Sequence, residues 1–294
     1  MSYRQIWLQR SIDFLARLEN KLRRMQMPKV SQGVQWAQFD AEQLTLAAPC
    51  FVLSTGRCGT LWLTKLLRLS RYAQVNHADY PELIRHGRLA YEQYAQEPRV
   101  FCEIIRATRD EFIARAYRYG QVYVETNNRI TFFAHAIKYV YPEARFIHLL
   151  RHPGDFVRSG LNRKWYGGQQ RHDLGRIVRR DSSGSWQTMS DVEKVAWLWN
   201  ETNQFIKNFV AELDGQQHIQ VRAEDMFSDP TVALSICEFI GVDDVEPEMV
   251  VKMLKRQINK QRQATIDPYK TWPDSEKECV RRYAVLAAHY GYGL

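Results

Sequence analysis

Hydrophobic positions along the chain alternate between two spacings. Apolar runs of strand length occur four times, at Cys50–Ser54, Gln121–Thr126, Arg145–Leu150 and His218–Arg222. Segments with apolar residues every three or four positions, as on one face of a helix, follow them at Thr60–Leu69, Ile130–Tyr141, beyond Pro153 and at Pro230–Ile240. This alternation predicts an α/β fold of three layers, with a central parallel sheet and helices on both faces.

A separate amphipathic pattern occupies the start of the chain. Apolar residues recur every three or four positions from Leu8 to Met25, which predicts a helix over residues 1–26. Residues 1–30 hold seven basic and two acidic side chains, so this helix is basic. A basic amphipathic helix can lie on an anionic membrane. Docking on its own domain, or pairing in a dimer, satisfies the apolar stripe with fewer assumptions.

The remaining pattern divides the rest of the chain. Residues 27–49 show little periodicity, and we interpret them as a linker. Residues 50–294 form the α/β domain in this division. Within it, residues 165–190 are rich in Gly, Ser, Arg and Gln and lack periodicity, which predicts a mobile loop.

Basic side chains outnumber acidic ones in this chain. Lys and Arg number 41 and Asp and Glu 33 among 294 residues, a formal net charge of +8. This excess favours an anionic partner: a nucleotide, a sulfated or phosphorylated metabolite, nucleic acid or a membrane surface. Nine basic and two acidic residues fall between positions 145 and 180, where they either attract such a partner or form a solvated basic surface.

Cysteine usage and the N-terminal residues bear on the compartment. The five cysteines form no C-x-x-C pair, which predicts free thiols, a reducing compartment and no zinc site. Arg4, Arg10 and Asp13 interrupt the apolar stretch that a signal peptide requires. No run approaches the roughly 18 apolar residues of a membrane span. We therefore expect a cytoplasmic protein, with peripheral membrane contact left open through residues 1–26.

The segment from Cys50 to Trp62, CFVLSTGRCGTLW, joins a strand to a helix through a glycine-containing turn. Backbone N–H groups at the start of such a helix converge on one point, which favours binding of an anion. Gly56 and Gly59 allow close approach of a ligand, and Arg57 adds a positive charge. A turn that binds nothing is the alternative, because short glycine-rich turns are common.

This turn differs from the Walker A loop of ATP-binding proteins. That loop requires G-x-x-x-x-G-K-[ST]. Here Gly56 and Gly59 are three positions apart, and no Lys-Ser or Lys-Thr pair follows. The sequence therefore implies no hydroxyl ligand for Mg²⁺ of the usual kind.

A second segment, Arg145 to Ser159, repeats the strand-to-helix arrangement. Arg151 stands at the carboxyl end of the predicted strand, and Pro153 suits the first turn of a helix. Because ligands of open α/β sheets bind outside the carboxyl ends of the strands, we expect Arg57 and Arg151 at the same edge. Two anion sites at one edge suit a ligand with phosphates at two ends. Alone, Arg151 could equally form a surface salt bridge.

Together these segments resemble the sulfotransferase family, whose members use 3′-phosphoadenosine 5′-phosphosulfate (PAPS). Ser54–Trp62 is similar to the family's loop for the 5′-phosphosulfate, and Leu150–Ser159 to its 3′-phosphate motif. Val221–Pro230 resembles a further recurring segment, and the order of all three agrees. The resemblance implies a P-loop-like fold and transfer of a sulfuryl group to a hydroxyl, or less readily an amine, by in-line displacement.

The resemblance also implies roles for single residues. Arg57 corresponds to the basic residue that contacts the bridging oxygen and the sulfonate. Backbone N–H groups that would hold the 5′-phosphate belong to Cys58, Gly59, Thr60 and Leu61. Trp62 stands where the family often places an aromatic ring against adenine, although a core tryptophan explains it equally well. Arg151 and Ser159 would hold the 3′-phosphate.

Two parts of the family pattern are weaker in this chain. A C-terminal basic loop usually completes the 3′-phosphate site, and Lys260 and Arg262 are the candidates here. Family members often have Tyr before the Glu-Asp pair, where this chain has Ala223. That difference leaves one adenine contact without its usual residue.

The general base is the least defined part of the site. His77 follows the first helix of the domain, where a second strand should end, and histidine titrates near neutral pH. Glu125 ends another predicted strand and is the second candidate. Asp79 could orient His77 or act as the base itself, and Glu103 and His135 are further candidates for the base. We expect catalysis by Arg57 with either His77 or Glu125 as base, and no metal ion.

Two other functions compete with sulfuryl transfer. An ATP-dependent P-loop kinase fits the fold, but the turn lacks the Lys-Ser/Thr pair. A basic module that binds anions or membranes without catalysis fits the charge, although no motif for nucleic acid is evident. The acceptor pocket should form from residues 77–109 and 165–190. An acceptor such as a glycan, a glycolipid or another small metabolite is compatible with them.

Overall fold

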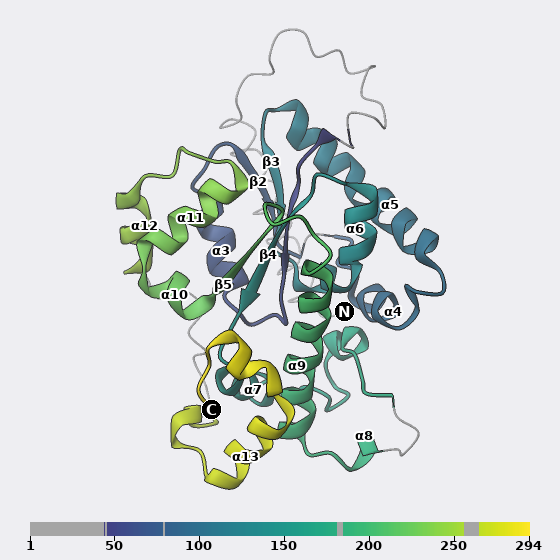
Figure 1. Cartoon of the computed structure of the whole chain (residues 1–294), viewed down its shortest axis with the longest axis vertical. Helices are drawn as coiled ribbons and strands as arrows, with labels where there is room; N and C mark the ends of the chain where they lie inside the picture. Colours follow the sequence, from purple (N-terminus) through teal and green to yellow (C-terminus); the bar gives the residue numbers. More distant parts are fainter. Residues whose placement is uncertain (1–43, 45, 79, 181–184, 256–264) are drawn as a thin grey trace, which may run out of the picture.

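Five parallel strands form the centre of the protein, seen here in a computed structural model (Figure 1). The structure describes residues 44, 46–78, 80–180, 185–255 and 265–294. The strands are β1 (Cys50–Leu53), β2 (Ala73–Asn76), β3 (Val122–Glu125), β4 (Arg145–Leu150) and β5 (His218–Arg222). Their order in the sheet is β2-β3-β1-β4-β5, and every pair is parallel. All carboxyl ends therefore meet at one edge.

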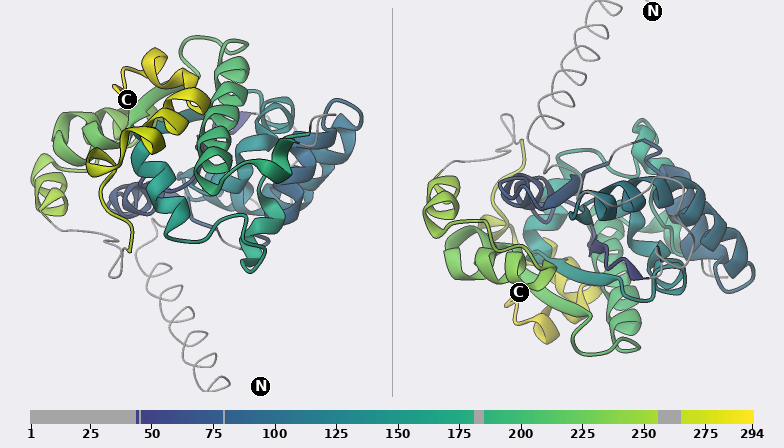
Figure 2. Two further views of the ribbon diagram at one scale, coloured as in Figure 1. Left: turned by 90° about the horizontal axis from the view of Figure 1, so that it is seen from below. Right: turned by 90° about the horizontal axis from the view of Figure 1, so that it is seen from above.

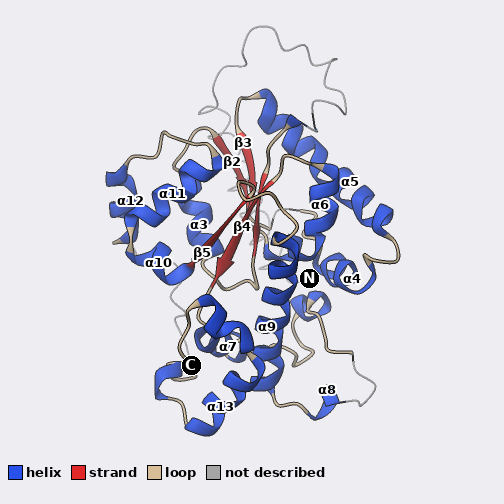
Figure 3. Cartoon of the chain, viewed as in Figure 1, coloured by secondary structure: helices blue, strands red, loops and turns tan. Residues whose placement is uncertain are grey.

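Helices cover both faces of this sheet, as predicted (Figure 3). On one face lie α3 (Thr60–Leu67), α10 (Ala223–Ser228), α11 (Pro230–Ile240) and α12 (Pro247–Leu254). On the other lie α4 (Ile84–Gln93), α5 (Pro98–Arg118), the 3₁₀ helix η2 (Asn128–Phe133), α6 (Ala134–Val140), α7 (Pro153–Leu161) and α9 (Asp191–Val210). The protein thus has the three-layer α/β fold that the hydrophobic pattern predicts.

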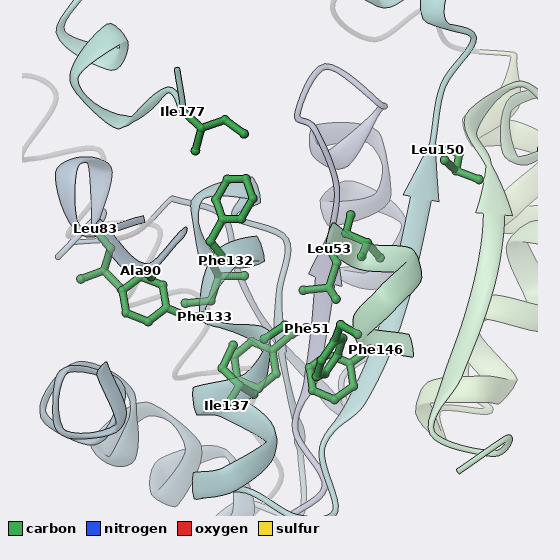
Figure 4. Close-up of a cluster of buried hydrophobic side chains, with 14 of the residues drawn as sticks. Phe51, Leu53, Leu83, Ala90, Phe132, Phe133, Ile137, Phe146, Leu150 and Ile177 are labelled. Carbon is green, nitrogen blue, oxygen red and sulfur yellow. The ribbon is translucent and has the colours of Figure 1, made fainter. Parts of the chain in front are cut away.

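Strand β1 shows how one short sequence supplies both layers. Phe51 and Leu53 pack into the cluster beneath α5, α6 and α9, whereas Cys50 and Val52 pack beneath α3 and α11. Successive side chains of a strand point to opposite faces, so a continuous apolar run is what a doubly covered strand requires. Figure 4 shows Phe51 and Phe146 side by side on one face, with ring centroids 6.3 Å apart.

The C-terminal segment packs beside α7 and α9 (Figure 2). It contains η4 (Tyr269–Thr271), α13 (Asp274–Tyr283) and η5 (Val285–Tyr290). Tyr269 covers the first turn of α7 so closely that a Cβ atom on Gly154 would lie 2.2 Å from its ring. The start of α7, which carries the second anion motif, is therefore held from the C-terminal side.

Most elements predicted from the sequence are confirmed. Strands β4 and β5 and helix α11 have the predicted bounds, and β2 ends directly before His77. The single helix predicted over residues 130–141 is instead η2 followed by α6. Helices α5 and α9 had no counterpart in the sequence interpretation.

Residues 165–190 contain more structure than their composition indicates. The 3₁₀ helix η3 (Arg171–Gly175) and the short helix α8 (Ser185–Thr188) lie here. Trp165 and Ile177 are buried, and the Tyr166 hydroxyl donates to the Ile177 carbonyl at 2.8 Å. The loop prediction missed these elements because each is too short to show a helical period.

Some predictions fall outside the described residues. The helix over residues 1–26, nearly all of the linker, Asp79, Lys260 and Arg262 are in this group. Within the described part of the chain, no helix combines the length and the apolar character that crossing a bilayer requires.

Candidate active site

The turn between β1 and α3 has a left-handed backbone at three positions. Gly56, Arg57 and Gly59 have φ angles of 77°, 58° and 87°. A left-handed conformation costs a non-glycine residue roughly 1–2 kcal/mol, and such strain is typical of functional sites. No hydrogen-bond acceptor among the described residues pairs with the backbone N–H groups that follow, those of Cys58, Gly59, Thr60 and Leu61. The turn therefore offers several donors at a helix N-terminus.

Side chains from η2 fix the end of β1. The Thr131 hydroxyl accepts from the Ser54 N–H and donates to the Ser54 carbonyl, each at 3.0 Å. The Ser54 hydroxyl in turn accepts from the Gly56 N–H at 3.2 Å. These hydrogen bonds attach the turn rigidly to the sheet.

Burial raises the pKa of the Cys58 thiol to about 11, so this cysteine stays protonated and inert near neutral pH.

Two aromatic rings lie over the outer side of this turn. A Cβ atom on Gly59 would lie 2.4 Å from the ring of Phe227, which is 42% exposed. Trp62 is only 5% exposed and meets Phe227 edge to face, with centroids 5.6 Å apart. Trp62 is therefore mainly a core residue, and Phe227 is the aromatic surface available beside the turn.

The second motif meets the first directly. The Arg151 guanidinium donates through Nη1 to the Arg57 carbonyl at 2.7 Å. The Ser159 hydroxyl accepts from Arg57 Nε at 3.3 Å and from Arg163 Nη1 at 3.1 Å. Arg57, Arg151, Ser159 and Arg163 therefore form one cluster, as expected for two anion sites at one edge of the sheet.

The peptide unit after Arg151 is held from two sides. Trp199 Nε1 donates to the Arg151 carbonyl, and the His152 N–H donates to Glu224, each at 2.9 Å. The Tyr292 hydroxyl donates to the other oxygen of Glu224 at 3.0 Å. Glu224 belongs to the third motif of the sequence, so this motif positions the second one.

The arginine cluster has no acidic partner. None of the ion pairs among the described residues includes Arg57, Arg151 or Arg163. Burial and the charges of Arg163 and Arg151 lower the pKa of Arg57 to about 10. Burial and Arg151 also lower the pKa of Arg163. Like charges held together in this way favour a bound anion.

His77 lies across a cavity from Arg57. Its Nδ1 atom is 2.8 Å from the Thr126 hydroxyl, which is 2.7 Å from the Thr64 hydroxyl. Thr64 donates its only proton to the Thr60 carbonyl at 2.7 Å. The Thr126 hydroxyl then gives its single proton to Thr64 or to the Asn76 carbonyl at 3.2 Å. In either case it can only accept from Nδ1 of His77, which therefore carries a proton. Nε2 is then the free acceptor.

The electrostatic surroundings keep His77 neutral. Burial, followed by the charges of Arg68, Arg129 and Arg57, lowers its pKa below the usual 6.5. A cavity of about 310 Å³ includes both His77 and Arg57 in its lining. A neutral imidazole with a free Nε2 beside such a cavity can accept a proton.

The family model described as the sulfotransferase family matches residues 49–247, more than half of the chain. The chain belongs to the sulfotransferase family. It is therefore a transferase, and its function is sulfuryl transfer in general terms. The match includes all three motifs and the segment that carries His77.

Solved sulfotransferases share the fold of this protein. The sulfotransferase domain of the curacin biosynthetic pathway is 18% identical with a TM-score of 0.51, over 84% of this chain and 99% of its own. The domain of the Synechococcus PCC 7002 olefin synthase is 16% identical with a TM-score of 0.52, over 89% and 100%. A sulfotransferase from Alicyclobacillus acidocaldarius is 16% identical with a TM-score of 0.52, over 84% and 97%. No curated protein matches this chain.

In this sulfotransferase, the Glu125 carboxylate forms an ion pair with Arg109. Its two oxygens accept from Arg109 Nε and Nη2 at 2.5 and 2.7 Å, and both side chains are almost fully buried. The Tyr123 hydroxyl also donates to Glu125 at 2.9 Å. This geometry disfavours Glu125 as the base, because its lone pairs already serve buried donors.

The other carboxylate and imidazole candidates lie in different surroundings. Glu103 is 75% exposed at its side chain and pairs with Arg106. His135 packs against the rings of Tyr94, Phe205 and Phe209. Neither is among the residues that line the cavity of His77 and Arg57. His77 is the titratable candidate of the described chain that the structure brings to Arg57.

Sequence reasoning missed several residues of the site. Arg163, Thr126 and Thr131 belong to none of the three motifs, and they reach the site only through the fold. Phe227 lies within the third motif, Val221–Pro230, but the sequence analysis assigns it no role. Arg163 lies four positions beyond Ser159, just after the end of α7, a spacing that could have indicated it. Among the described residues, no group of three or more His, Cys, Asp and Glu side chains could hold a metal ion.

Proposed function

We propose that this sulfotransferase uses PAPS as donor and transfers its sulfuryl group to a hydroxyl of an acceptor by in-line displacement. One observation carries the proposal: the Arg57–Ser159 contact joins an anion-binding turn to a second cationic motif. Two anion sites whose arginines form no ion pair within the described part of the chain fit a nucleotide that bears phosphates at its 5′ and 3′ ends. ATP would leave the second site without an anion, which disfavours the ATP-dependent kinase.

The residues present fit PAPS at each end. The unpaired N–H groups of Cys58, Gly59, Thr60 and Leu61 would hold the 5′-phosphate. Arg151 and Ser159 would hold the 3′-phosphate, and we add Arg163 because it shares the Ser159 hydroxyl. Lys260 and Arg262 remain proposed further contacts.

For the adenine we propose Phe227, with Trp62 behind it. Phe227 presents the exposed ring beside the turn, and its edge-to-face contact with Trp62 keeps that ring in place. Ala223, which replaces the usual tyrosine, is 1% exposed and offers no ring. In this proposal, the ring of Phe227, about one helical turn beyond Ala223 on α10, makes the contact that the family pattern assigns to the tyrosine.

PAPS, when bound, supplies an activated sulfuryl group whose leaving group is a phosphate oxygen. Arg57 would neutralise the charge that grows on that oxygen, and a fixed donor of this kind typically contributes about 10²–10³-fold. Because a loose transition state needs positioning and charge stabilisation above all, protein cations suffice and we propose no metal requirement.

His77 would act as the general base. The Thr126 hydroxyl holds the proton of Nδ1 and leaves Nε2 free to take the proton of the acceptor hydroxyl. The lowered pKa keeps this nitrogen unprotonated near neutral pH. A positioned base contributes about 10²–10⁴-fold. Thr126 and Thr64 are positioning residues for this histidine.

Residues 1–26 are proposed as a contact outside the catalytic domain. Their basic amphipathic pattern suits docking on the domain, pairing with a second copy, or peripheral attachment to an anionic membrane. Removal of residues 1–26 followed by vesicle sedimentation and measurement of the molecular mass separates the three. The compartment we propose is the cytoplasm, because the five cysteines form no C-x-x-C pair and are free thiols in the structure, as is typical of a reducing compartment.

The direct test follows release of adenosine 3′,5′-bisphosphate from PAPS in the presence of phenols, sugars and hydroxy acids. We expect release that depends on an acceptor and is lost in Arg57→Ala. Consumption of ATP with phosphorylation of the acceptor, and no release from PAPS, would contradict the proposal.

A further inference from the structure

A second group of basic side chains lies near His77, besides the arginine cluster. Arg129, His172 and Arg176 line the same cavity of about 310 Å³ as Arg57 and His77. No acidic residue of the described chain lines this cavity. The second group comes from η2, η3 and the residue after η3, whereas Arg151 and Arg163 flank α7.

The two groups meet at this cavity, because Arg57 and Arg163 of the arginine cluster also line it. Besides burial, the charges of Arg163 and Arg151 lower the pKa of Arg57, and the charge of Arg129 lowers that of Arg176. Arg129 and Arg57 each lower the pKa of His77. His77 is therefore exposed to the charge of both groups.

Arg129 is held in place by neighbours outside the cavity. Its Nη1 atom donates to Glu82 at 2.6 Å, and its Nη2 atom donates to Nδ1 of His172 at 2.8 Å. Because a guanidinium only donates, Nδ1 of His172 must accept. The proton of neutral His172 is then on Nε2. Nε2 of His172 is therefore a hydrogen-bond donor, whereas Nε2 of His77 is an acceptor.

Arg176 is fixed in a similar way. It pairs with Asp173, and its guanidinium lies over the Trp165 ring at 4.2 Å from the centroid. The side chains of Arg129 and Arg176 are only 17% and 12% exposed. Two partly buried guanidinium groups and one imidazole N–H thus surround the same space, oriented in advance for a carboxylate or phosphate.

We propose that the acceptor is an alcohol that also carries a carboxylate, phosphate or sulfate group, which Arg129 and Arg176 bind while the hydroxyl lies beside His77. This inference rests on the proposed function, because it assigns the other basic cluster to PAPS. Glu82 and Asp173 pair with Arg129 and Arg176 but are not among the residues that line the cavity. The two guanidinium groups therefore have their carboxylate partners outside the cavity and can offer their remaining N–H donors to an anionic group inside it.

The test uses the full chain saturated with adenosine 3′,5′-bisphosphate, to which inorganic phosphate is added in a calorimeter. We expect phosphate to bind, and Arg129→Gln or Arg176→Gln to weaken that binding about 10–100-fold. Arg171→Gln is the matched control, since Arg171 also pairs with Glu82 but its side chain is 68% exposed and does not line the cavity.

The outcomes separate this inference from the proposed function. Failure of adenosine 3′,5′-bisphosphate to bind would overturn the proposed function itself. Binding of that nucleotide without any phosphate binding would overturn only the anionic acceptor. Phosphate binding that is lost in Arg57→Ala but unchanged in Arg129→Gln and Arg176→Gln would place the ion at the vacated sulfonate position and also overturn it.

A pair of ligands gives an independent readout that needs no variant. The same nucleotide-saturated protein is titrated with 3-hydroxybenzoate and with 3-hydroxybenzamide, which differ in the charge of one group. We expect the acid to bind at least about tenfold more tightly than the amide. Equal binding of the two, binding of neither, or tighter binding of the amide would overturn the anionic acceptor.

Discussion

The Nε atom of Arg57 donates to the Ser159 hydroxyl across 3.3 Å, although 102 positions separate the two residues. The contact is a consequence of the sheet. Strands β1 and β4 are parallel neighbours with Leu53 opposite His148, so the turns that follow them leave the same edge. Arg57 and Ser159 thereby combine two short motifs into one site for a ligand with two anionic ends.

Replacement of Arg57 and of Arg151 should give different kinetic results. Arg57→Ala should lower kcat by about 10²–10³-fold with only partial loss of nucleotide binding, because Arg57 acts on charge that develops in the transition state. Arg151→Ala should instead weaken binding of adenosine 3′,5′-bisphosphate by about 1.5–3 kcal/mol, the usual loss for a charged hydrogen bond. Steady-state kinetics and calorimetry measure the two effects.

Arg99→Ala provides the control for this comparison, since Arg99 is exposed on α5. It should leave both quantities unchanged. Full transfer activity in both Arg57→Ala and Arg151→Ala would show that the site is assigned to the wrong residues.

The pH dependence of kcat/KM should have an acidic limb set by His77. Burial and nearby arginines lower the pKa of His77 below 6.5, so the base form persists above that value and is lost as the pH falls through the lowered pKa. The rate should therefore rise with pH, with the midpoint of the acidic limb below 6.5, and reach its plateau above that midpoint. Loss of the limb in His77→Asn, with a much lower rate, would identify the histidine.

The charge of Arg68 gives this assignment a sharper check. Arg68 is the largest of the charges that lower the pKa of His77, so Arg68→Gln should move the acidic limb to higher pH and leave the plateau rate unchanged. Arg71→Gln, at an exposed position three residues along, should not move it. An unmoved limb in Arg68→Gln would mean that another group titrates.

Glu125→Gln should destabilise the protein strongly. The substitution leaves the Arg109 guanidinium buried without a counter-ion, and breaking a buried pair typically costs about 3–5 kcal/mol. Urea unfolding measures the loss. Replacing both residues by hydrophobic ones should cost less than Glu125→Gln alone.

The catalytic outcome of Glu125→Gln is equally informative. Folded Glu125→Gln should retain the acidic limb of the pH profile, because the carboxylate takes no proton from the acceptor. A variant that folds normally and loses turnover by more than about 10²-fold would make Glu125 the base after all.

Gly59→Ala should weaken nucleotide binding for two separable reasons. The φ angle of 87° disfavours any side chain, at roughly 1–2 kcal/mol, and the new Cβ would lie 2.4 Å from the Phe227 ring. Because Phe227 is also the proposed adenine contact, the steric part is measured as the free energy of unfolding in urea. Gly59→Ala should cost less stability in a chain that already carries Phe227→Ala than in the unaltered chain. An equal cost in both chains would mean that the ring is not the obstacle.

Much of the fold could be predicted from the sequence, because strands β1 to β4 are short and almost entirely buried. Cys50–Leu53 is continuously apolar since both faces of the sheet are covered, and the glycines at 56 and 59 mark the end of the strand. The bounds of β4 followed from the same pattern, and those of β5 were also as predicted although this edge strand is only partly buried. Helix α5 escaped notice because its apolar positions are interspersed with many charged residues.

Of the site, the sequence predicted the residues that follow the end of a strand. Arg57, Arg151 and His77 each follow a strand, so parallel topology alone brings them to one edge. Glu125 also ends a strand, but no pattern in the sequence indicates that Arg109 reaches it from α5. Arg129 and His172 are joined across 43 positions through a segment without periodicity, which no local pattern reveals.

The central claim, a nucleotide site with two anionic ends, is tested most directly by calorimetric titration with adenosine 3′,5′-bisphosphate, ATP, ADP and AMP in the absence of magnesium. The account predicts tight binding of the 3′,5′-bisphosphate and weak binding of the other three, because only the first supplies an anion to both Arg57 and Arg151. Preference for ATP, or binding of none of the four, would contradict it.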